Sequence, residues 1–260
     1  MSTKTVLITG AGSGLGRALA VEANRHGHRI ILVGRRDAPL AETAALIRDV
    51  MILPADVTTA AGRDSIAATV ADTGLDILIN NAGIVPSGTL ETLRDEEIAA
   101  TLAVNVAAPL SLTRDLLGAL SASRGQVVNM GSVFGDIGFP YFSAYSASKF
   151  GLRGWSDALR RELAPRGIAV TYLAPRATRT DATAGFDRLV GPMAMTLDDP
   201  QVVTARAWRA IAARRREQLP ASRERLFVTL QRLRPAIIDR ALIRLARDPA
   251  VIAAARNSSS

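Results

Sequence analysis

The chain contains no cysteine in its 260 residues. A disulfide framework, a thiol nucleophile and a cysteine-based zinc site are therefore excluded. Long apolar runs are missing too: none approaches the roughly 18 residues that would cross a bilayer. The first residues also lack the apolar stretch and small-residue cleavage site of a secretory signal. We therefore expect a cytoplasmic protein.

Aromatic residues make up only 4% of the chain, whereas 48% of the residues are hydrophobic. This composition is ordinary for a globular protein with ample core, and at this length one domain is the simplest organisation. The two histidines, His26 and His28, precede an expected strand with no evident third ligand. We therefore expect no metal site.

Acidic residues are scarce only in the C-terminal part of the chain. Residues 201–260 contain thirteen arginines and four acidic residues, a net charge of +9. The whole chain carries +8, so the first 200 residues sum to −1. Because the body is nearly neutral, the charge argues against a protein that binds nucleic acid with its whole surface. We expect no nucleic-acid partner.

Short β-branched runs alternate with longer runs rich in alanine and leucine over the first 175 residues. The expected strands are Thr5–Thr9, Arg29–Val33, Val50–Pro54, Ile77–Asn80, Gln126–Asn129 and Ala169–Leu173. The expected helices are Leu15–Asn24, Ala38–Ile47, Asp64–Asp72, Glu96–Ser121 with a bend at Pro109, and Ala144–Ala164. Apolar strands separated by helices are typical of βαβ units. The sequence therefore predicts an α/β fold with a doubly wound parallel sheet of the Rossmann type.

A glycine-rich turn stands between the first expected strand and the first expected helix. Glycines permit a tight turn and close approach of the backbone to a pyrophosphate, and the helix N-terminus offers free N–H groups. A glycine run alone could be an ordinary loop, but its place in a βαβ series indicates a dinucleotide site. The residues concerned are Gly10, Gly12, Ser13, Gly14, Leu15 and Gly16.

The second expected strand is followed by Gly34, Arg35 and Arg36, where a cofactor with a free ribose 2′-hydroxyl usually meets a carboxylate. Two guanidinium groups suit a 2′-phosphate, which favours NADP(H) over NAD(H). The alternative is a solvated pair of charges that begins the next helix.

Two further turns lie at the same predicted sheet edge. Asp56 and Val57 follow the third strand, where a carboxylate and the backbone could meet an adenine edge. Asn81, Ala82 and Gly83 follow the fourth strand, where small residues let the backbone pass close to a nucleotide. Each turn alone could be ordinary turn chemistry, but together they indicate a nucleotide crevice.

Tyr145 and Lys149 stand four residues apart at the start of an expected helix, so they share one helical face. A tyrosine pKa near 10 is too high for a base at neutral pH, and a nearby ammonium would lower it. Such a phenol is an acid for carbonyl reduction and a base for alcohol oxidation. Ser132, after the fifth strand, could hydrogen-bond the substrate oxygen. The alternative is an aromatic–cation pair on the surface.

This set of motifs resembles the short-chain dehydrogenase/reductase family of the Tyr-x-x-x-Lys type. The motifs TGAGSGLG, NNAG, YSASK and PRATRT, together with Asn105 and Ser132, appear in that family's order over about residues 4–180. The resemblance implies a Rossmann fold, a nicotinamide cofactor and a homodimer or homotetramer built partly from the long helices. It also implies a catalytic tetrad of Asn105, Ser132, Tyr145 and Lys149, with Tyr145 and Lys149 also touching the cofactor.

The PRATRT motif departs from the family at one position. The family usually has Pro-Gly here, whereas this chain has Pro175 and Arg176. We expect Arg176 to point to solvent, or else to touch a phosphate or an acidic group of the substrate. Pro175, Thr178 and Thr180 match the family's cofactor-binding positions, and Thr178 is placed to reach the carboxamide.

The sequence gives the fewest structural signals for residues 181–260. Residues 181–200 contain two glycines, two prolines and two methionines, which predicts a mobile flap over the substrate. We take residues 1–220 as the catalytic domain and 221–260 as a basic amphipathic helical extension, divided at Pro235. That extension could dock on its own domain or on a second subunit, or lie on an anionic membrane at the inner membrane surface. We expect the polar tail from Asn257 to be disordered.

The sequence thus predicts an oxidoreductase that transfers hydride between NADP(H) and a small-molecule carbonyl or secondary alcohol. Two alternatives stay open. One is a regulatory or scaffold protein that binds NADP(H) with little turnover, and the other is a membrane-surface reductase of lipid-like substrates.

Overall fold

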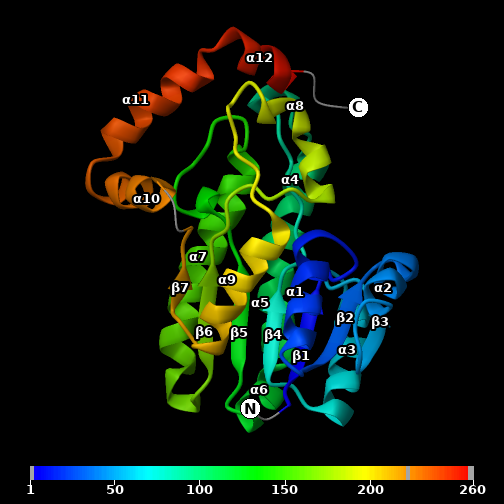
Figure 1. The fold of residues 1–260 in the computed structure, drawn as a ribbon. Helices are drawn as coiled ribbons and strands as arrows, with labels where there is room; N and C mark the ends of the chain where they lie inside the picture. The colour runs from blue at the N-terminus through cyan, green and yellow to red at the C-terminus, as the bar shows by residue number, and fades with distance from the viewer. Residues whose placement is uncertain (1–2, 221–222, 257–260) are drawn as a thin grey trace.

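The computed structural model describes residues 3–220 and 223–256. Within these residues seven strands form one sheet, in the order β3-β2-β1-β4-β5-β6-β7, and every neighbouring pair is parallel (Figure 1). The strands are β1 (Thr5–Thr9), β2 (Arg29–Gly34), β3 (Val50–Pro54), β4 (Ile77–Asn80), β5 (Gln126–Met130), β6 (Ala169–Leu173) and β7 (Glu217–Gln218). This arrangement confirms the predicted doubly wound parallel sheet.

Helices cover both faces of the sheet, and several lie above it in the view of Figure 1. They are α1 (Gly14–Arg25), α2 (Asp37–Ala44), α3 (Ala60–Thr73), α4 (Asp95–Leu102), α5 (Ala108–Asp115), α6 (Leu117–Ala122), α7 (Ser143–Leu163), α8 (Asp187–Val190), α9 (Pro200–Ala212), α10 (Arg223–Leu233), α11 (Pro235–Ala246) and α12 (Pro249–Arg256). One core layer packs α1 and α9 on the sheet, and the other packs α3, α5 and α7 on the opposite face. Because the central strands are covered on both sides, their apolar residues do not alternate with polar ones.

The two histidines belong to the first of these layers. The His26 ring stacks on Trp208 of α9 with ring centroids 5.6 Å apart, and the His28 ring lies 5.3 Å from the same indole. Burial is the largest cause of the lowered pKa of His28. Both imidazoles thus serve the packing of α9 against α1.

The chain order reverses between β1 and β4, which are adjacent in the sheet. The chain segment that follows β1 runs to one face of the sheet, and the segment that follows β4 runs to the other. The two segments therefore diverge at the carboxyl ends of these strands. Such a switch point is where open α/β sheets bind their ligands. The predicted glycine turn and the Asn81 turn both stand there.

Three elements differ from the sequence-based expectation. The helix expected over Glu96–Ser121 is divided by a π-helical segment, Ala103–Ala107, and again before α6. β7 and α12 were not predicted: a two-residue strand carries almost no periodic signal. The tail from Asn257 lies outside the described residues.

A C-terminal arm, α10–α12, passes along one side and over the top of the body (Figure 1). Its inner side packs through Val228 and Ile238 on Ile137 and Phe139, and through Val251 and Ala255 on α8. The arm therefore docks on its own domain. No helix in the described part of the chain combines the length and hydropathy needed to cross a bilayer.

Candidate active site

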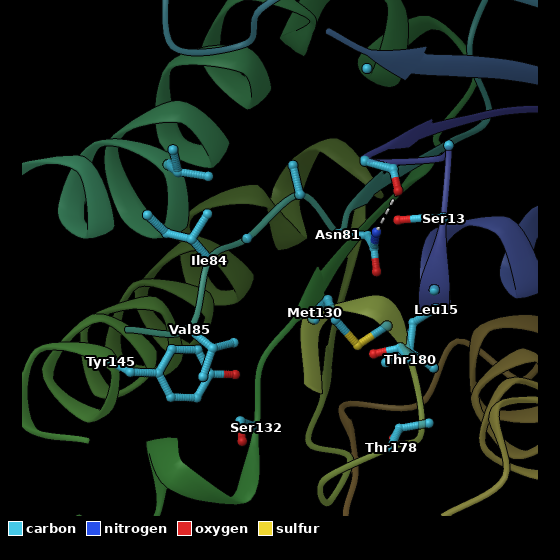
Figure 2. A pocket seen from close by; sticks show the side chains of 18 of the residues that line it. Ser13, Leu15, Asn81, Ile84, Val85, Met130, Ser132, Tyr145, Thr178 and Thr180 are labelled. Atoms are coloured by element: carbon cyan, nitrogen blue, oxygen red, sulfur yellow. Dashed lines mark hydrogen bonds between the residues drawn. The ribbon is translucent and has the colours of Figure 1, made fainter. Parts of the chain in front are cut away.

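A pocket of about 520 Å³ runs along the carboxyl edge of the sheet and across the switch point. Figure 2 shows Ser13, Leu15 and Thr180 toward one end, and Tyr145 and Ser132 toward the other. The predicted site residues that line this pocket are Gly10, Gly12, Ser13, Gly14, Leu15, Arg35, Arg36, Asp56, Val57, Asn81, Ala82, Gly83, Ser132, Tyr145, Lys149, Pro175, Thr178 and Thr180. The other two, Gly16 and Asn105, are buried behind its wall.

The turn after β1 depends on glycine for conformation and for space. Gly10 and Gly14 have positive φ values of 65° and 54°, which side chains disfavour. A Cβ at Gly16 would lie 2.1 Å from the carbonyl oxygen of Gly10, so helix α1 could not begin so close to the turn. The backbone of this turn therefore carries no side chain at its glycines and is accessible beside the N-terminus of α1. This cradle fits a pyrophosphate.

The turn after β4 is held to β1 by Thr9, which begins the TGAGSGLG motif but was not predicted as a site residue. Its Oγ1 accepts from the backbone N–H groups of Asn81 and Ala82, each at 3.0 Å. The Asn81 side chain donates in turn to the carbonyl oxygen of Thr9 at 2.9 Å. The two turns of the switch point are therefore one rigid unit.

The residues that follow β2 and β3 place charged side chains in the lining of the pocket. Arg35 and Arg36 are exposed beside the pocket, and no carboxylate among the described residues forms an ion pair with either guanidinium. Asp56 accepts from the hydroxyl of Thr58 at 2.7 Å, and this bond is the largest cause of its lowered pKa, with a smaller effect of Arg35. A carboxylate and two available cations thus face the same end of the pocket.

Tyr145 and Ser132 meet at the opposite end. Ser132 caps a 3-10 turn, Val133–Gly135, where its Oγ accepts from Phe134 N at 3.1 Å. Tyr145 extends from the first turn of α7, and its side chain lines this end of the pocket together with that of Ser132 (Figure 2). The Phe134 ring stands edge-on to Tyr145 at 5.9 Å and fixes the phenol from the side. The two hydroxyls can therefore address a single oxygen atom.

Burial governs the pKa of both titratable groups at this end. It raises the pKa of Tyr145 to about 12, against a smaller lowering by the Ser132 hydrogen bond. It lowers the pKa of Lys149 to about 8, because an ammonium is costly to desolvate. The sequence predicted a lowered pKa for the phenol. In the protein alone that expectation is wrong, since desolvation outweighs any effect of the lysine.

Lys149 lies one turn after Tyr145 and is buried. Its Nζ donates to the carbonyl oxygen of Met130 at 2.8 Å and stands 5.5 Å from the centre of the Tyr145 ring. A Cβ at Gly83 would lie 3.7 Å from this Nζ and 3.2 Å from Asn105 Oδ1. The lysine thus stands in the wall between the glycine turns and the phenol.

Asn105 occupies the π-helical segment between α4 and α5. Its side chain accepts from Ile84 N and donates to Ile84 O, both at 2.9 Å, and it also donates to the hydroxyl of Ser148 at 3.0 Å. It therefore binds the loop after β4 to α7. The wider turn of a π-helix brings this side chain inward.

Arg176 does not point to solvent, so that expectation was wrong: its side chain is 19% exposed and lines the pocket. Its guanidinium is hydrogen-bonded to both carboxylate oxygens of Asp198, and it donates to Glu224 of α10 at 2.8 Å. These two carboxylates, from segments distant in the sequence, raise the pKa of Arg176 further above its usual range. The arginine thus ties the loop after β6 to the C-terminal arm.

Apolar side chains surround the phenol end of the pocket. Val85, Phe134, Phe142, Phe186 and Met195 all line it there and belong to one buried cluster. Phe139 and Tyr141 belong to the cluster without lining the pocket. No described group of three or more His, Asp or Glu side chains is arranged to hold a metal ion.

The segment of residues 181–200 forms a 3-10 turn, Asp181–Gly185, and the short helix α8. Arg188 fastens it, donating to the carbonyl oxygens of Ser87 at 2.7 Å and of Ala254 in α12 at 2.9 Å. Ala182, Phe186 and Met195 line the pocket from this side. The segment thus forms part of the pocket wall, and it rests on the arm.

Tyr172 of β6 is a supporting residue that the sequence did not reveal. Its hydroxyl lies 3.3 Å from the carbonyl oxygen of Ser132 and 3.4 Å from that of Lys149, and it accepts from Ser132 N. A Cβ at Gly131 would lie 2.1 Å from its ring, so that glycine makes room for it. In the sequence Tyr172 is simply one residue of an apolar strand.

Comparison with known proteins agrees with this geometry. The profile described as short chain dehydrogenase matches residues 4–188. The ketoacyl reductase HetN of Nostoc sp. is 29% identical over 253 residues, which cover 92% of this chain and 88% of that protein.

The similar solved structures include several with bound nicotinamide cofactors. A short-chain dehydrogenase from Sphingobium yanoikuyae in complex with NADPH has a TM-score of 0.77 and 30% identity, and the match covers 91% of this chain and 95% of that chain. A 3-ketoacyl-(acyl-carrier-protein) reductase from Brucella melitensis complexed with NADH has a TM-score of 0.73 and 28% identity, covering 80% and 90%. The chain therefore belongs to the short-chain dehydrogenase family and is an NAD(P)-dependent oxidoreductase.

Proposed function

We propose that the protein interconverts a carbonyl and a secondary alcohol with NADP(H) as the redox partner, and that Tyr145 is the general acid and base. The observation that carries this proposal is the position of Tyr145. Tyr145 lies beside Ser132 in the lining of the same pocket that begins at the glycine cradle of α1. A proton donor thus faces the pocket that would hold the nicotinamide.

In this proposal the cofactor supplies or accepts the hydride at the substrate carbon. In reduction, Ser132 donates a hydrogen bond to the carbonyl oxygen, which holds it while negative charge develops. The Tyr145 hydroxyl then gives its proton to that oxygen, and the product is the alcohol. Lys149 favours the phenolate that remains and holds the ribose, while Asn105 supports the return of the proton. Oxidation reverses these steps.

Arg35 and Arg36 support the choice of NADP(H). Both guanidinium groups lie at the pocket without a carboxylate partner in the described chain, where they can bind a 2′-phosphate with charge-assisted hydrogen bonds. The contacts proposed for Asp56, Val57, Thr178 and Thr180 complete the cofactor site. The apolar wall around Tyr145 favours a substrate whose carbonyl carries apolar groups, including lipid-like chains.

We further infer that the protein works as a homo-oligomer. Phe150 projects from α7 and is 44% exposed. A large aromatic side chain on the outer face of the helix that carries Tyr145 and Lys149 is a natural contact for a second subunit.

Tyr145→Phe tests the role of the phenol. We expect kcat in an NADPH-consumption assay over ketones, aldehydes and acyl-type substrates to fall by about 10²–10⁴-fold, because the proton donor is lost. NADPH affinity, measured by fluorescence titration, should change little. Tyr141→Phe is the matched control, since that hydroxyl donates to the carbonyl oxygen of Ala246 outside the pocket. Near-normal turnover of Tyr145→Phe would refute the assignment. NADPH binding without turnover of any substrate by the wild type would instead indicate a regulatory or scaffold role.

Replacing both Arg35 and Arg36 by serine tests the cofactor preference. We expect the Kd for NADPH to rise by about 100-fold, since charge-assisted hydrogen bonds to the phosphate are lost, while the Kd for NADH stays nearly constant. Arg48→Ser, an exposed arginine outside the pocket, serves as the control. Equal losses for both cofactors would argue against a 2′-phosphate site.

A further inference from the structure

The outer face of α10 and α11 is an amphipathic surface that the docking of the arm leaves uncovered. The inner side of these helices packs on the body through Val228, Leu230, Ile238 and Leu242. The outer face, as we use the term, consists of Leu226, Phe227, Leu233, Arg234, Ile237, Arg240, Ile243, Arg244 and Arg247. In Figure 1 both helices stand at the periphery, with no other element beyond them.

Large apolar side chains are concentrated on this face. Leu226 and Leu233 are 68% and 73% exposed, and Phe227, Ile237 and Ile243 are between 42% and 49% exposed. These five are a large share of the twelve large apolar side chains that are exposed anywhere in the described chain. Scattered apolar residues need no explanation, but a group on two consecutive helices indicates a contact surface.

Arginines are interspersed among these apolar side chains. Ile237, Arg240, Arg244 and Arg247 follow one another at intervals of three or four residues and so lie on one side of α11. Arg234, Arg240, Arg244 and Arg247 have no ion pair within the described residues, whereas Arg232, on the inner side, pairs with Asp136 at 2.8 Å. The outer face thus offers apolar groups and available positive charge together.

We propose that this face binds the surface of a bilayer that contains anionic lipids. Leucine, isoleucine and phenylalanine side chains enter the boundary between headgroups and acyl chains, and the guanidinium groups meet lipid phosphates. A second copy of the chain fits poorly, because a symmetric contact would bring the unpaired arginines of two faces together. Nucleic acid would satisfy the charge but would leave the leucines without an apolar environment.

Flotation of the full-length protein with vesicles tests the proposal. We expect binding to phosphatidylcholine vesicles that contain phosphatidylglycerol, little binding to phosphatidylcholine alone, and a loss of binding as salt is raised. Leu226→Ser/Leu233→Ser and Arg240→Gln/Arg244→Gln should each bind at least about tenfold more weakly, since each removes one half of the attraction.

Leu46→Ser/Leu90→Ser is the matched control, because these leucines are 60% and 71% exposed elsewhere on the protein. NADPH titration verifies that each variant is folded, and light scattering gives its mass. The proposal is overturned if the wild type ignores anionic vesicles or if the control loses binding as much as the outer-face variants. A fall in oligomer mass confined to the outer-face variants would also overturn it, since the face would then be a subunit contact. The assay requires no turnover, so either result leaves the proposed redox function standing.

Discussion

At the residue scale, Lys149 differs from nearly every other cation of the protein. The chain contains 32 lysines and arginines, and the sequence shows only two lysines, Lys4 and Lys149. A guanidinium keeps its proton under all ordinary conditions, whereas a buried ammonium shifts its pKa readily. Burial lowers the pKa of Lys149 to about 8, so this position holds a cation whose charge depends on its surroundings.

The lowered pKa predicts how stability depends on pH. An unfolded lysine titrates near 10.4, so between about pH 8 and pH 10 the unfolded chain binds more protons than the folded one. The free energy of unfolding of the cofactor-free protein should therefore rise across this window, by on the order of 2–3 kcal/mol. Tyr145 has the opposite effect only above about pH 10, because its pKa is raised to about 12.

Urea denaturation at several pH values, with Lys149→Met beside the wild type, measures this effect. The rise should disappear in Lys149→Met and persist in Lys4→Met, the other lysine variant. If the free energy of unfolding of the wild type is constant or falls from pH 8 to pH 10, burial of the Lys149 ammonium has little effect on stability.

At the element scale, helix α10 connects two loops that flank the site. Arg232 pairs with Asp136, four residues after Ser132, and Glu224 pairs with Arg176 in the loop after β6. Asp136 is buried, and desolvation is the largest cause of its raised pKa, against the two arginines that favour its charge. The arm therefore restrains both loops at the substrate end.

Arg176→Met should lower the free energy of unfolding by about 1–3 kcal/mol, because Asp198 and Glu224 lose hydrogen bonds to a partly buried cation. The KM for substrate should rise more than the Kd for NADPH, since Arg176 connects the loop after β6 to the arm. Thermal or urea denaturation and steady-state kinetics measure both quantities. Arg206→Met, an exposed arginine of α9, should leave them unchanged. If Arg176→Met and Arg206→Met have the same free energy of unfolding and the same kinetic constants, the ion pairs of Arg176 contribute nothing to either.

At the scale of the whole molecule, the inferred homo-oligomer leads to a test on α7. Phe150→Glu places a charge where we expect a subunit contact, and a buried unpaired charge is costly. The mass from size-exclusion chromatography with light scattering should fall to that of one chain, while Leu102→Glu, also an exposed apolar position, supplies the comparison. An unchanged mass for Phe150→Glu would place any subunit contact elsewhere.

Local signals in the sequence determined the fold class and the contents of the pocket. Each motif adjoins a strand end: Gly10 follows β1, Asn81 follows β4 and Ser132 follows β5. In a parallel sheet those ends meet at one edge, so residues far apart in the chain converge without any knowledge of side-chain packing. The boundaries of β1 to β6 were predicted to within one residue for the same reason, since buried parallel strands are short apolar runs.

Only the tertiary structure decided which groups face one another across the chain. Asp198 and Glu224 neutralise Arg176 from 22 and 48 residues away, and Tyr172 reaches Ser132 from 40 residues away. The pKa of Tyr145 likewise depends on burial by the surrounding cluster rather than on its lysine neighbour. Periodicity and motif spacing report only what one segment prefers. A partner's identity and the extent of desolvation depend on how all segments pack, and these exist only once the chain has folded.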